Sequence, residues 1–202
     1  MPVIHLVRHA QGVHNTSEEA LKLRDPELTD LGREQCAALA GAFPFQDAVT
    51  HVVASPFRRT LYTALLAFEP ALRRTSSRVV ALPLIQEVST LPCDVGSPVA
   101  KLRGEFGDRV DLDGLPDDWY AKPRGGRYAP EMDKLQARSR EARVWLRDLA
   151  RDDAHVVVVS HGGFLHFLTG DWEGIDPNRG ECVRLDEQIS GYWRRKRPDE
   201  GC

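Results

Sequence analysis

Side chains that could handle a phosphate group follow four apolar segments of the chain. They are two arginines, two histidines and a glutamate: Arg8, Arg59, His9, His161 and Glu87. A phosphomonoester dianion needs several fixed cations, and the planar guanidinium of arginine matches the spacing of phosphate oxygens. A neutral imidazole can attack phosphorus and so divide one difficult step into two. These residue types therefore favour phosphoryl transfer.

The second histidine and the glutamate suit two further steps of phosphoryl transfer, which are charge stabilisation and protonation of the leaving group. A second imidazole across the site, in its charged imidazolium form, can stabilise the equatorial oxygens of the phosphoryl group. The carboxylic acid of Glu87 can protonate the leaving oxygen, because partial burial would raise its pKa. A helix that begins after His161 and Gly162 would add backbone N–H groups at its N-terminus.

The elements that must position these residues can be predicted from the apolar pattern. Strands are predicted at residues 2–7, Val49–Ala54, 79–84 and His155–Ser160, and helices at 30–43, 56–68, 130–150 and from Gly162 onward. Ser55 would be the N-cap of the second helix, and Pro56 its first residue. Strands that alternate with helices and are apolar on both faces predict a mostly parallel sheet in a three-layer α/β/α sandwich. Ligands bind outside the carboxyl ends of such strands, so the candidate residues should meet there.

The segment 88–130 differs from the rest of the chain. It is rich in glycine and proline and has poor periodicity, so we interpret it as a largely irregular lid inserted in a single domain of residues 1–202. Trp119 and Tyr120 would either cover a substrate or pack the lid. The charged side chains of the lid, which include Asp94 and Lys122, are expected to be mostly solvated.

Charge and hydropathy exclude several classes of partner. The 202 residues include 27 basic and 30 acidic side chains, and a net charge of −3 argues against a broad nucleic-acid surface. The apolar runs are far shorter than the roughly 20 residues of a membrane span. The basic tail at residues 192–202 is expected to be solvated.

No metal site is expected. His5 and His9 have a spacing that joins metal ligands on a helix, but in a strand they would lie roughly 13 Å apart. The cysteines show no zinc-finger spacing and are expected to be reduced thiols of a cytoplasmic protein: Cys36, Cys93, Cys182 and Cys202.

Three further histidines and one arginine have less defined roles. We expect His5 to pack in its strand and His166 to be structural. His14 either lines the pocket or, in preference, is a satisfied loop histidine. Arg58 either faces the site or is a surface neighbour of Arg59, because successive helical side chains point about 100° apart and cannot both face the site equally.

Five blocks of sequence in a fixed order carry a resemblance to a known family. The blocks are LVRHA at residues 6–10 followed by Asn15, ELTDLGREQ at 27–35, SPFRRTLYTA at 55–64, Glu87, and VSHGG at 159–163. Together they resemble the histidine phosphatase superfamily, which includes the cofactor-dependent phosphoglycerate mutases. The stretch RHAQGVHN at residues 8–15 is similar to the small fungal and plant branch of mutase-like proteins.

The resemblance implies a role for each matching residue. It makes His9 the phosphorylated histidine and Glu87 the proton donor. Five residues would form the phosphate pocket: Arg8, Asn15, Arg59, His161, which would also take part in catalysis, and Gly162 through its backbone N–H. No cofactor or metal is implied. Ala10 and Gln11 depart from the glycine and glutamate that are commoner in the family.

The leading functional hypothesis is a metal-independent phosphatase that hydrolyses a small phosphomonoester through a phosphohistidine at His9. A phosphoglycerate mutase is a second hypothesis, although the short chain and the unmatched lid argue against it. A third is a lyase, isomerase or ligand-binding protein that uses the same anion pocket, because a fold does not determine a function. The partner would be a small phosphorylated metabolite or other small anion, with no nucleic acid and no membrane, and the oligomeric state is left open.

Overall fold

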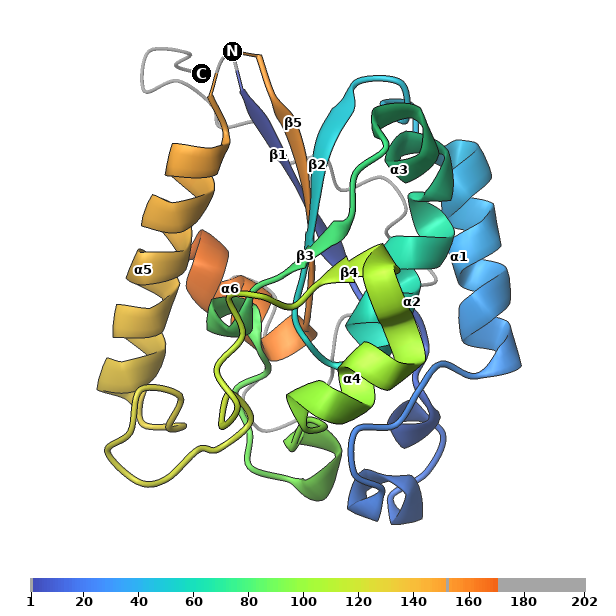
Figure 1. Cartoon of the computed structure of the whole chain (residues 1–202). Coiled ribbons are helices and arrows are strands. Elements are labelled where there is room, and N and C mark those ends of the chain that lie inside the picture. The colour runs from blue at the N-terminus through green and yellow to red at the C-terminus, as the bar shows by residue number, and fades with distance from the viewer. Residues whose placement is uncertain (1, 152, 171–202) are drawn as a thin grey trace, which may run out of the picture.

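A computed structural model describes residues 2–151 and 153–170, and in these residues one parallel sheet forms the centre of the molecule (Figure 1). Its strands lie in the order β1-β5-β2-β3-β4, and each pair of neighbours is parallel. The strands are β1 (Val3–Arg8), β2 (Val49–Ala54), β3 (Val79–Ala81), β4 (Val110–Asp111) and β5 (His155–Ser160). The order places β5 between β1 and β2, which brings distant parts of the sequence together.

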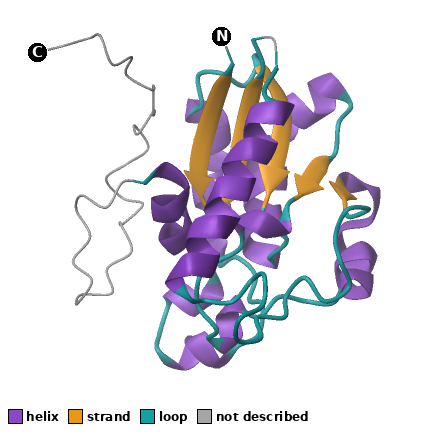
Figure 2. Cartoon of the chain, turned by 90° about the vertical axis from the view of Figure 1, so that its left-hand side faces the viewer, coloured by secondary structure: helices purple, strands orange, loops and turns teal. Residues whose placement is uncertain are grey.

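Helices cover both faces of the sheet. One face carries α1 (Asp30–Ala42), α2 (Arg58–Ala67), α3 (Glu69–Thr75) and α4 (Val99–Phe106), and the other carries α5 (Met132–Leu149) and α6 (Gly162–Thr169). Figure 2 looks onto the second face, with the sheet behind its helices. In β5, Val157 and Val159 pack with the first group of helices, and Val156 and Val158 pack with the second. Successive strand residues point to opposite faces, so a run of valines serves both cores. The predicted three-layer α/β/α sandwich is confirmed.

β3 is shorter than predicted. The predicted strand 79–84 ends at Ala81, and a short 3₁₀ helix, η3 (Pro83–Ile85), follows it. Pro83 accounts for the early end, because proline has no N–H for the strand ladder and holds φ near the helical value. This turn leads directly into Glu87 at the edge of the sheet.

α2 begins later than predicted. Its first residue is Arg58 and its N-cap is Phe57, so the prediction that Ser55 caps this helix is wrong. The hydroxyl of Ser55 lies 2.9 Å from Nε2 of His161 instead. The helix α3, which follows α2 directly, is not predicted from the sequence.

The segment 88–130 is more ordered than predicted. It contains η4 (Pro92–Asp94), α4, η5 (Gly107–Arg109) and β4, which extends the sheet by pairing with β3. Residues 112–131 have no regular secondary structure. Trp119 anchors this stretch: it is fully buried, its Nε1 donates to the carbonyl oxygen of Ser97 at 3.0 Å, and its ring meets Phe57 edge-on. Trp119 therefore packs the lid.

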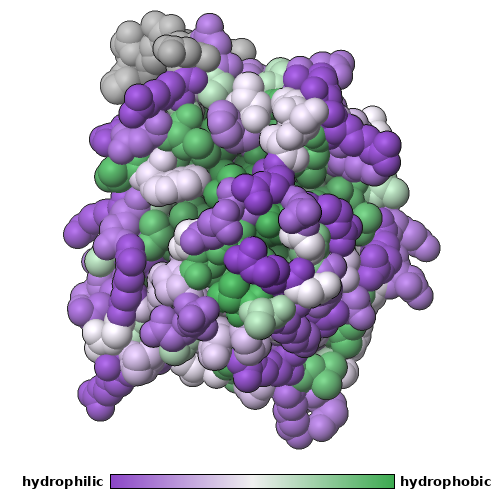
Figure 3. Space-filling model, viewed as in Figure 1, coloured by the Kyte–Doolittle hydropathy of each residue, from purple (hydrophilic) through white to green (hydrophobic). Residues whose placement is uncertain are grey.

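The surface is mainly hydrophilic on the face that Figure 3 shows, with apolar residues visible near its centre. Within residues 2–151 and 153–170, no helix combines the length and the apolar character that a membrane span requires. Cys36 and Cys93 are buried free thiols. Cys182, Cys202 and the basic tail at 192–202 lie outside the described residues.

Candidate active site

The carboxyl ends of β1 and β5 bring two histidines together. Arg8 and Ser160, the last residues of these strands, are partners in the sheet, and they are followed by His9 and His161. The two imidazole ring centroids are 5.2 Å apart, and both side chains are buried. Two imidazoles far apart in the sequence thus lie next to each other in a buried position, as a common anion site requires.

The hydrogen bonding of His9 determines which ring nitrogen is free. Its Nδ1 lies 2.7 Å from the carbonyl oxygen of Ala10, and because a carbonyl can only accept, Nδ1 must carry the proton. The lone pair of the neutral ring is therefore on Nε2. Burial, followed by the charge of Arg59, holds the pKa of His9 well below its usual range. His9 is thus neutral at neutral pH, with Nε2 able to act as a nucleophile.

The block at residues 27–35 supports the loop after β1. The hydroxyl of Thr29 caps α1, and its backbone N–H donates to the carbonyl oxygen of Gln11 at 3.0 Å. Gln35 accepts from the N–H of Gln11 at 2.8 Å, and Thr29 donates to the side-chain oxygen of Gln11 at 2.7 Å. Gly32 must lack a side chain, because an added Cβ would lie 2.2 Å from the carbonyl oxygen of Gln11. The departure at Gln11 is therefore compatible with a well-supported loop.

Arg59 is a buried cation at the centre of the site. It comes from the first turn of α2 and is 1% exposed. Its Nη1 donates to the carbonyl oxygen of Cys93 at 2.8 Å, and its Nη2 donates to Asp94 at 2.7 Å and to Nδ1 of His161 at 3.1 Å. Its Nε has no hydrogen-bond partner in the part of the chain that the structure describes. A buried donor of this kind beside two imidazoles suits an anionic ligand.

The protonation of His161 differs from the expectation. A guanidinium can only donate, so Nδ1 of His161 accepts from Arg59 and carries no proton. Nε2 carries the ring proton and lies 2.9 Å from the hydroxyl oxygen of Ser55. Burial, followed by the charge of Arg59, keeps the pKa of His161 well below its usual range. The ring is neutral and orients Arg59, so the predicted imidazolium is wrong for this arrangement.

The carboxyl group of Glu87 lies at the N-terminus of α6. Its Oε1 accepts from the backbone N–H of Val88 at 2.8 Å and from that of Phe164 at 3.1 Å. Gly163 approaches so closely that an added Cβ would lie 2.6 Å from Oε1. Burial, followed by a neighbouring carboxylate, raises the pKa of Glu87, which suits a proton donor. Gly162 is the first residue of α6, and its N–H as a phosphate ligand stays a prediction.

His14 lies in the site, which is the less favoured of its two predicted roles. It belongs to a 3₁₀ turn, η1 (Val13–Asn15), and its ring centroid is 5.3 Å from that of His9. The side chain is buried and its Nδ1 has no hydrogen-bond partner among the described residues, so it is not a satisfied loop histidine. Burial, followed by nearby arginine charge, lowers the pKa of His14 to about 3. Its neighbour Asn15 is exposed and accepts from the N–H of Gly12 at 3.0 Å, so its pocket role stays a prediction.

Of the three candidate arginines, Arg8 and Arg59 lie beside the histidines, whereas Arg58 contacts the lid. Nε of Arg58 donates to Glu105 on α4 at 2.8 Å, so Arg58 ties α2 to the lid, and Arg59 is the one of the pair that contacts His161. Arg8 ends β1 and is partly buried, and its charge contributes to the lowered pKa of His9. Arg8 and Arg59 therefore both place positive charge beside the histidines.

Asp94 and Lys122 also belong to the site, although the sequence predicts that they are solvated. Asp94 is buried and paired with Arg59. Nζ of Lys122 donates to the carbonyl oxygens of Glu87 at 2.8 Å and Ser89 at 2.6 Å. Burial lowers the pKa of Lys122 to about 8. No signal in the sequence marks either residue, because they lie in a segment without periodicity and reach the site only through the tertiary structure.

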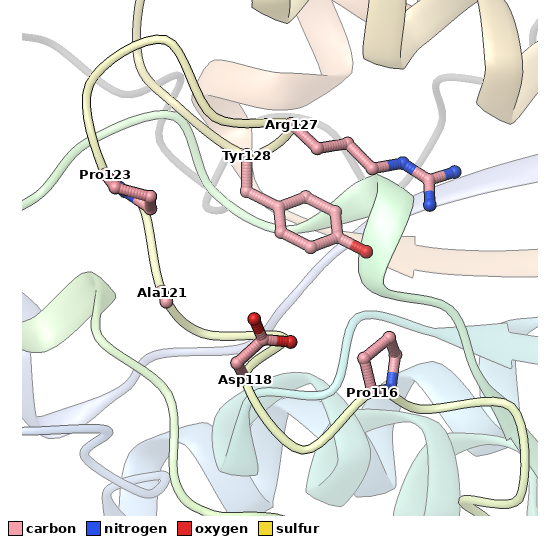
Figure 4. Close-up of a pocket in the computed structure, with 6 residues that line it drawn as sticks. All are labelled: Pro116, Asp118, Ala121, Pro123, Arg127 and Tyr128. Atoms are coloured by element: carbon pink, nitrogen blue, oxygen red, sulfur yellow. The ribbon is translucent and has the colours of Figure 1, made fainter.

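A separate hollow lies within the lid (Figure 4). It has a volume of about 250 Å³ and is lined by Pro116, Asp118, Ala121, Pro123, Arg127 and Tyr128. The hydroxyl of Tyr128 and the carboxylate of Asp118 face the same space. Lys122, between two of the lining residues, contacts Glu87, so this part of the lid is joined to the catalytic edge of the sheet.

Comparison with known proteins identifies the family. Residues 4–192 match the family model of the histidine phosphatase superfamily (branch 1). The chain therefore belongs to the histidine phosphatase superfamily, as the five blocks of sequence predict. Phosphoryl transfer, by a phosphatase or a mutase-type enzyme, is the general class of activity that this membership supports.

Individual relatives agree with the predicted branch. A phosphoglycerate mutase-like protein of Arabidopsis thaliana is 29% identical, over 93% of this chain and 79% of its own. A probable phosphatase of Schizosaccharomyces pombe is 30% identical, over 51% of this chain and 49% of its own. The solved structure of ecdysone phosphate phosphatase from Bombix mori, in complex with tungstate, has a TM-score of 0.61 at 21% identity, covering 88% of this chain and 82% of that one. At that identity the structural likeness shows the fold alone.

Proposed function

We propose that this chain is a phosphatase that hydrolyses a small phosphomonoester through a phosphohistidine at His9. The observation that carries this proposal is the hydrogen bond from Nδ1 of His9 to the carbonyl oxygen of Ala10, which leaves the lone pair on Nε2. The ring of His161 lies beside that of His9, and its Nδ1 accepts from the buried guanidinium of Arg59. A phosphate held there would meet a nucleophile and a cation together.

The proposed reaction has two steps. In the first, Nε2 of His9 forms a bond to phosphorus while the bond from phosphorus to the ester oxygen breaks. Glu87 gives its proton to that oxygen, which leaves as an alcohol. Arg8 and Arg59 stabilise the charge on the phosphoryl oxygens. In the second step, the Glu87 carboxylate takes a proton from a water molecule whose oxygen forms a bond to phosphorus, while the bond from phosphorus to Nε2 of His9 breaks. Inorganic phosphate leaves, and His9 and protonated Glu87 are restored.

We propose that the reaction needs no metal ion, because side chains of the protein provide the positive charge. Arg8, Arg59 and the lid residue Lys122 place three cationic groups around the histidines and Glu87. Full activity in EDTA is therefore expected.

We further propose that the substrate is a small metabolite and that the reaction takes place in the cytoplasm. His9 is only 3% exposed, which favours a small phosphomonoester over a phosphate on the surface of a macromolecule. The buried thiols of Cys36 and Cys93 fit a reducing compartment.

Turnover of p-nitrophenyl phosphate, with and without EDTA, tests this function. We expect release of inorganic phosphate that EDTA does not reduce, and a loss of several orders of magnitude in His9→Ala. His51→Ala, on β2 and outside the site, is the matched control and should retain activity. Folded protein without activity on a broad panel of phosphomonoesters would refute the proposal.

Product analysis separates the alternatives. A mutase would interconvert 2- and 3-phosphoglycerate after priming with bisphosphoglycerate, and would release little inorganic phosphate. A lyase, an isomerase or a ligand-binding protein would release none and would not depend on phosphorylation of His9. Either result would replace the phosphatase proposal.

A further inference from the structure

A carboxylate of the lid, Asp94, lies inside the site. It is 6% exposed and ends the short helix η4. Its Oδ1 accepts from Nη2 of Arg59 at 2.7 Å, and its Oδ2 accepts from the hydroxyl of Ser89 at 2.5 Å. The preceding residue, Cys93, accepts from Nη1 of Arg59 at 2.8 Å through its carbonyl oxygen. One turn of the lid thus holds both terminal nitrogens of Arg59.

We propose that Asp94 is a positioning residue that fixes the Arg59 guanidinium toward His161 and the phosphate. The inference rests on the phosphatase function proposed above. A guanidinium is planar, so two fixed terminal nitrogens also fix the direction of its remaining N–H groups. One of those, Nε, is the buried donor without a partner among the described residues. The orientation of Arg59 therefore depends on the lid as well as on its own helix.

Asp94 also adds negative charge near Glu87. The charged groups around Glu87 come from several elements: Arg59 on α2, Lys122 on the lid and Arg138 on α5, in addition to Asp94. Positive charge favours the ionised form of Glu87, whereas burial and then the charge of Asp94 raise its pKa. Asp94 thus favours the protonated form of Glu87, which the first step of the reaction needs.

The contact between Asp94 and Arg59 has an alternative interpretation, in which the carboxylate competes with the phosphate. Carboxylate and phosphate are both anions that bind a guanidinium through their oxygens. A competitor would weaken phosphate binding, whereas a positioning residue strengthens it. Removal of the carboxylate therefore has opposite effects under the two interpretations.

Two substitutions at this position separate charge from hydrogen bonding. Asp94→Asn keeps an oxygen that can accept from Arg59 but removes the charge, and Asp94→Ala removes both. Asp117→Asn makes the same change of charge at an exposed position of the lid and is the matched control. The measurements are turnover of p-nitrophenyl phosphate as a function of pH, and calorimetric binding of inorganic phosphate.

We expect Asp94→Ala to lower kcat/KM by about 100-fold and to weaken phosphate binding, because Arg59 loses its fixed orientation. Asp94→Asn should lower kcat/KM by about tenfold. It should also move the alkaline limb of the kcat profile to lower pH, because Glu87 then ionises more readily. Asp117→Asn should behave as the wild type.

Several outcomes would overturn the inference. If the wild type is active and both Asp94 variants match it in turnover, pH profile and phosphate affinity, the inference fails while the proposed function stands. Tighter phosphate binding in either variant would show that Asp94 competes with phosphate for Arg59 and does not position it. If the wild type is inactive, the proposed function fails, and the phosphate-binding measurements alone decide the role of Asp94. If Asp94→Ala does not fold, Asp94→Asn supplies both measurements.

Discussion

Single hydrogen bonds determine what each histidine of the site can do. His9 donates its Nδ1 proton to a carbonyl oxygen, so its Nε2 is left with the lone pair. His161 is held in the opposite tautomer, because Arg59 donates to its Nδ1 and Ser55 accepts the proton of its Nε2. Two identical side chains with ring centroids 5.2 Å apart therefore have different chemical capacities, set by their partners.

Gly163→Ala should displace the proton donor without changing its chemistry. The new Cβ would lie 2.6 Å from Oε1 of Glu87 and 3.0 Å from Cγ2 of Val88, so the carboxyl group must move. We expect kcat for an alkyl phosphate to fall by about tenfold or more, because an alkoxide leaves poorly without a proton. Turnover of p-nitrophenyl phosphate, whose leaving group is stable as an anion, should fall less.

Gly104→Ala is the control for this substitution. Gly104 lies on α4, and an added Cβ there meets nothing within 4 Å. It should leave turnover of both substrates unchanged. Equal effects of Gly163→Ala on the alkyl and the aryl phosphate would show that Glu87 is not the proton donor.

The secondary-structure elements act in pairs, one carrying a catalytic group and another holding it. β1 leads to His9, and α1 holds the loop that follows through Thr29, Gly32 and Gln35. α2 carries Arg59, and the lid turn η4 orients it. The family blocks therefore include residues such as Thr29, Gly32 and Gln35, which support the loop that follows β1.

Two glycines of α1 test this support. Gly32→Ala would place a Cβ 2.2 Å from the carbonyl oxygen of Gln11, so α1 and the catalytic loop must separate. We expect kcat/KM to fall by about tenfold or more, and the free energy of unfolding to fall by about 1–3 kcal/mol. Gly41→Ala meets nothing within 4 Å, and should keep activity and gain up to about 1 kcal/mol of stability. Urea unfolding measures the stability of each variant, and steady-state kinetics measure kcat/KM. Equal values for Gly32→Ala and Gly41→Ala would contradict the role of α1 in supporting the loop after β1.

The sequence carries clear signals for the elements of this fold. The valines of β5 form an apolar run that is typical of a strand buried on both faces, and the structure places this strand between β1 and β2. The order of the family blocks identifies His9, Arg59, Glu87 and His161, which the structure brings to one edge.

Residues that act through distant contacts could not be predicted in this way. Ser55 has the sequence pattern of a helix cap, yet its hydroxyl contacts His161. Asp94 and Lys122 belong to a lid with little periodicity, and only the packing of that lid carries them into the site. His14 differs from an ordinary loop histidine only because the loop folds back onto His9.

The fold as a whole buries several histidines in their neutral form. His5 packs with Phe43 and Phe45, as predicted, and its Nε2 lies 3.0 Å from Nδ1 of His155. Burial, followed by the charge of His155, lowers the pKa of His5 to about 4. The histidines of the site have lowered pKa values as well: His9, His14 and His161.

Stability should therefore fall as the pH drops below the histidine pKa of about 6.5 in the unfolded chain. In that range the unfolded chain binds protons that the folded protein excludes, and each such proton lowers the free energy of unfolding by about 1.4 kcal/mol per pH unit. Burial raises the pKa values of Asp25 and Glu87, so these two groups favour the folded protein as the pH falls. The four described histidines with lowered pKa values outnumber them: His5, His9, His14 and His161.

His5→Gln isolates one of these protons, because glutamine can hydrogen-bond to His155 but does not titrate. The free energy of unfolding in urea should fall less between about pH 7 and about pH 5 in this variant. The difference in slope should correspond to the uptake of about one proton. An unchanged slope would show that the folded protein accepts the proton at His5. Because His5 packs against Phe43, Phe45 and His155, away from the proposed catalytic histidines, its replacement should not alter turnover.

A test for the proposed phosphohistidine is the decisive measurement. Folded protein is mixed with a ³²P-labelled phosphomonoester, quenched in alkali during turnover and mapped by peptide analysis. We predict phosphate that is stable in base and labile in acid, carried by the peptide that contains His9 and absent in His9→Ala. Phosphate hydrolysis without any labelled protein, or a label on His14 or His161 in place of His9, would contradict the proposed role of His9.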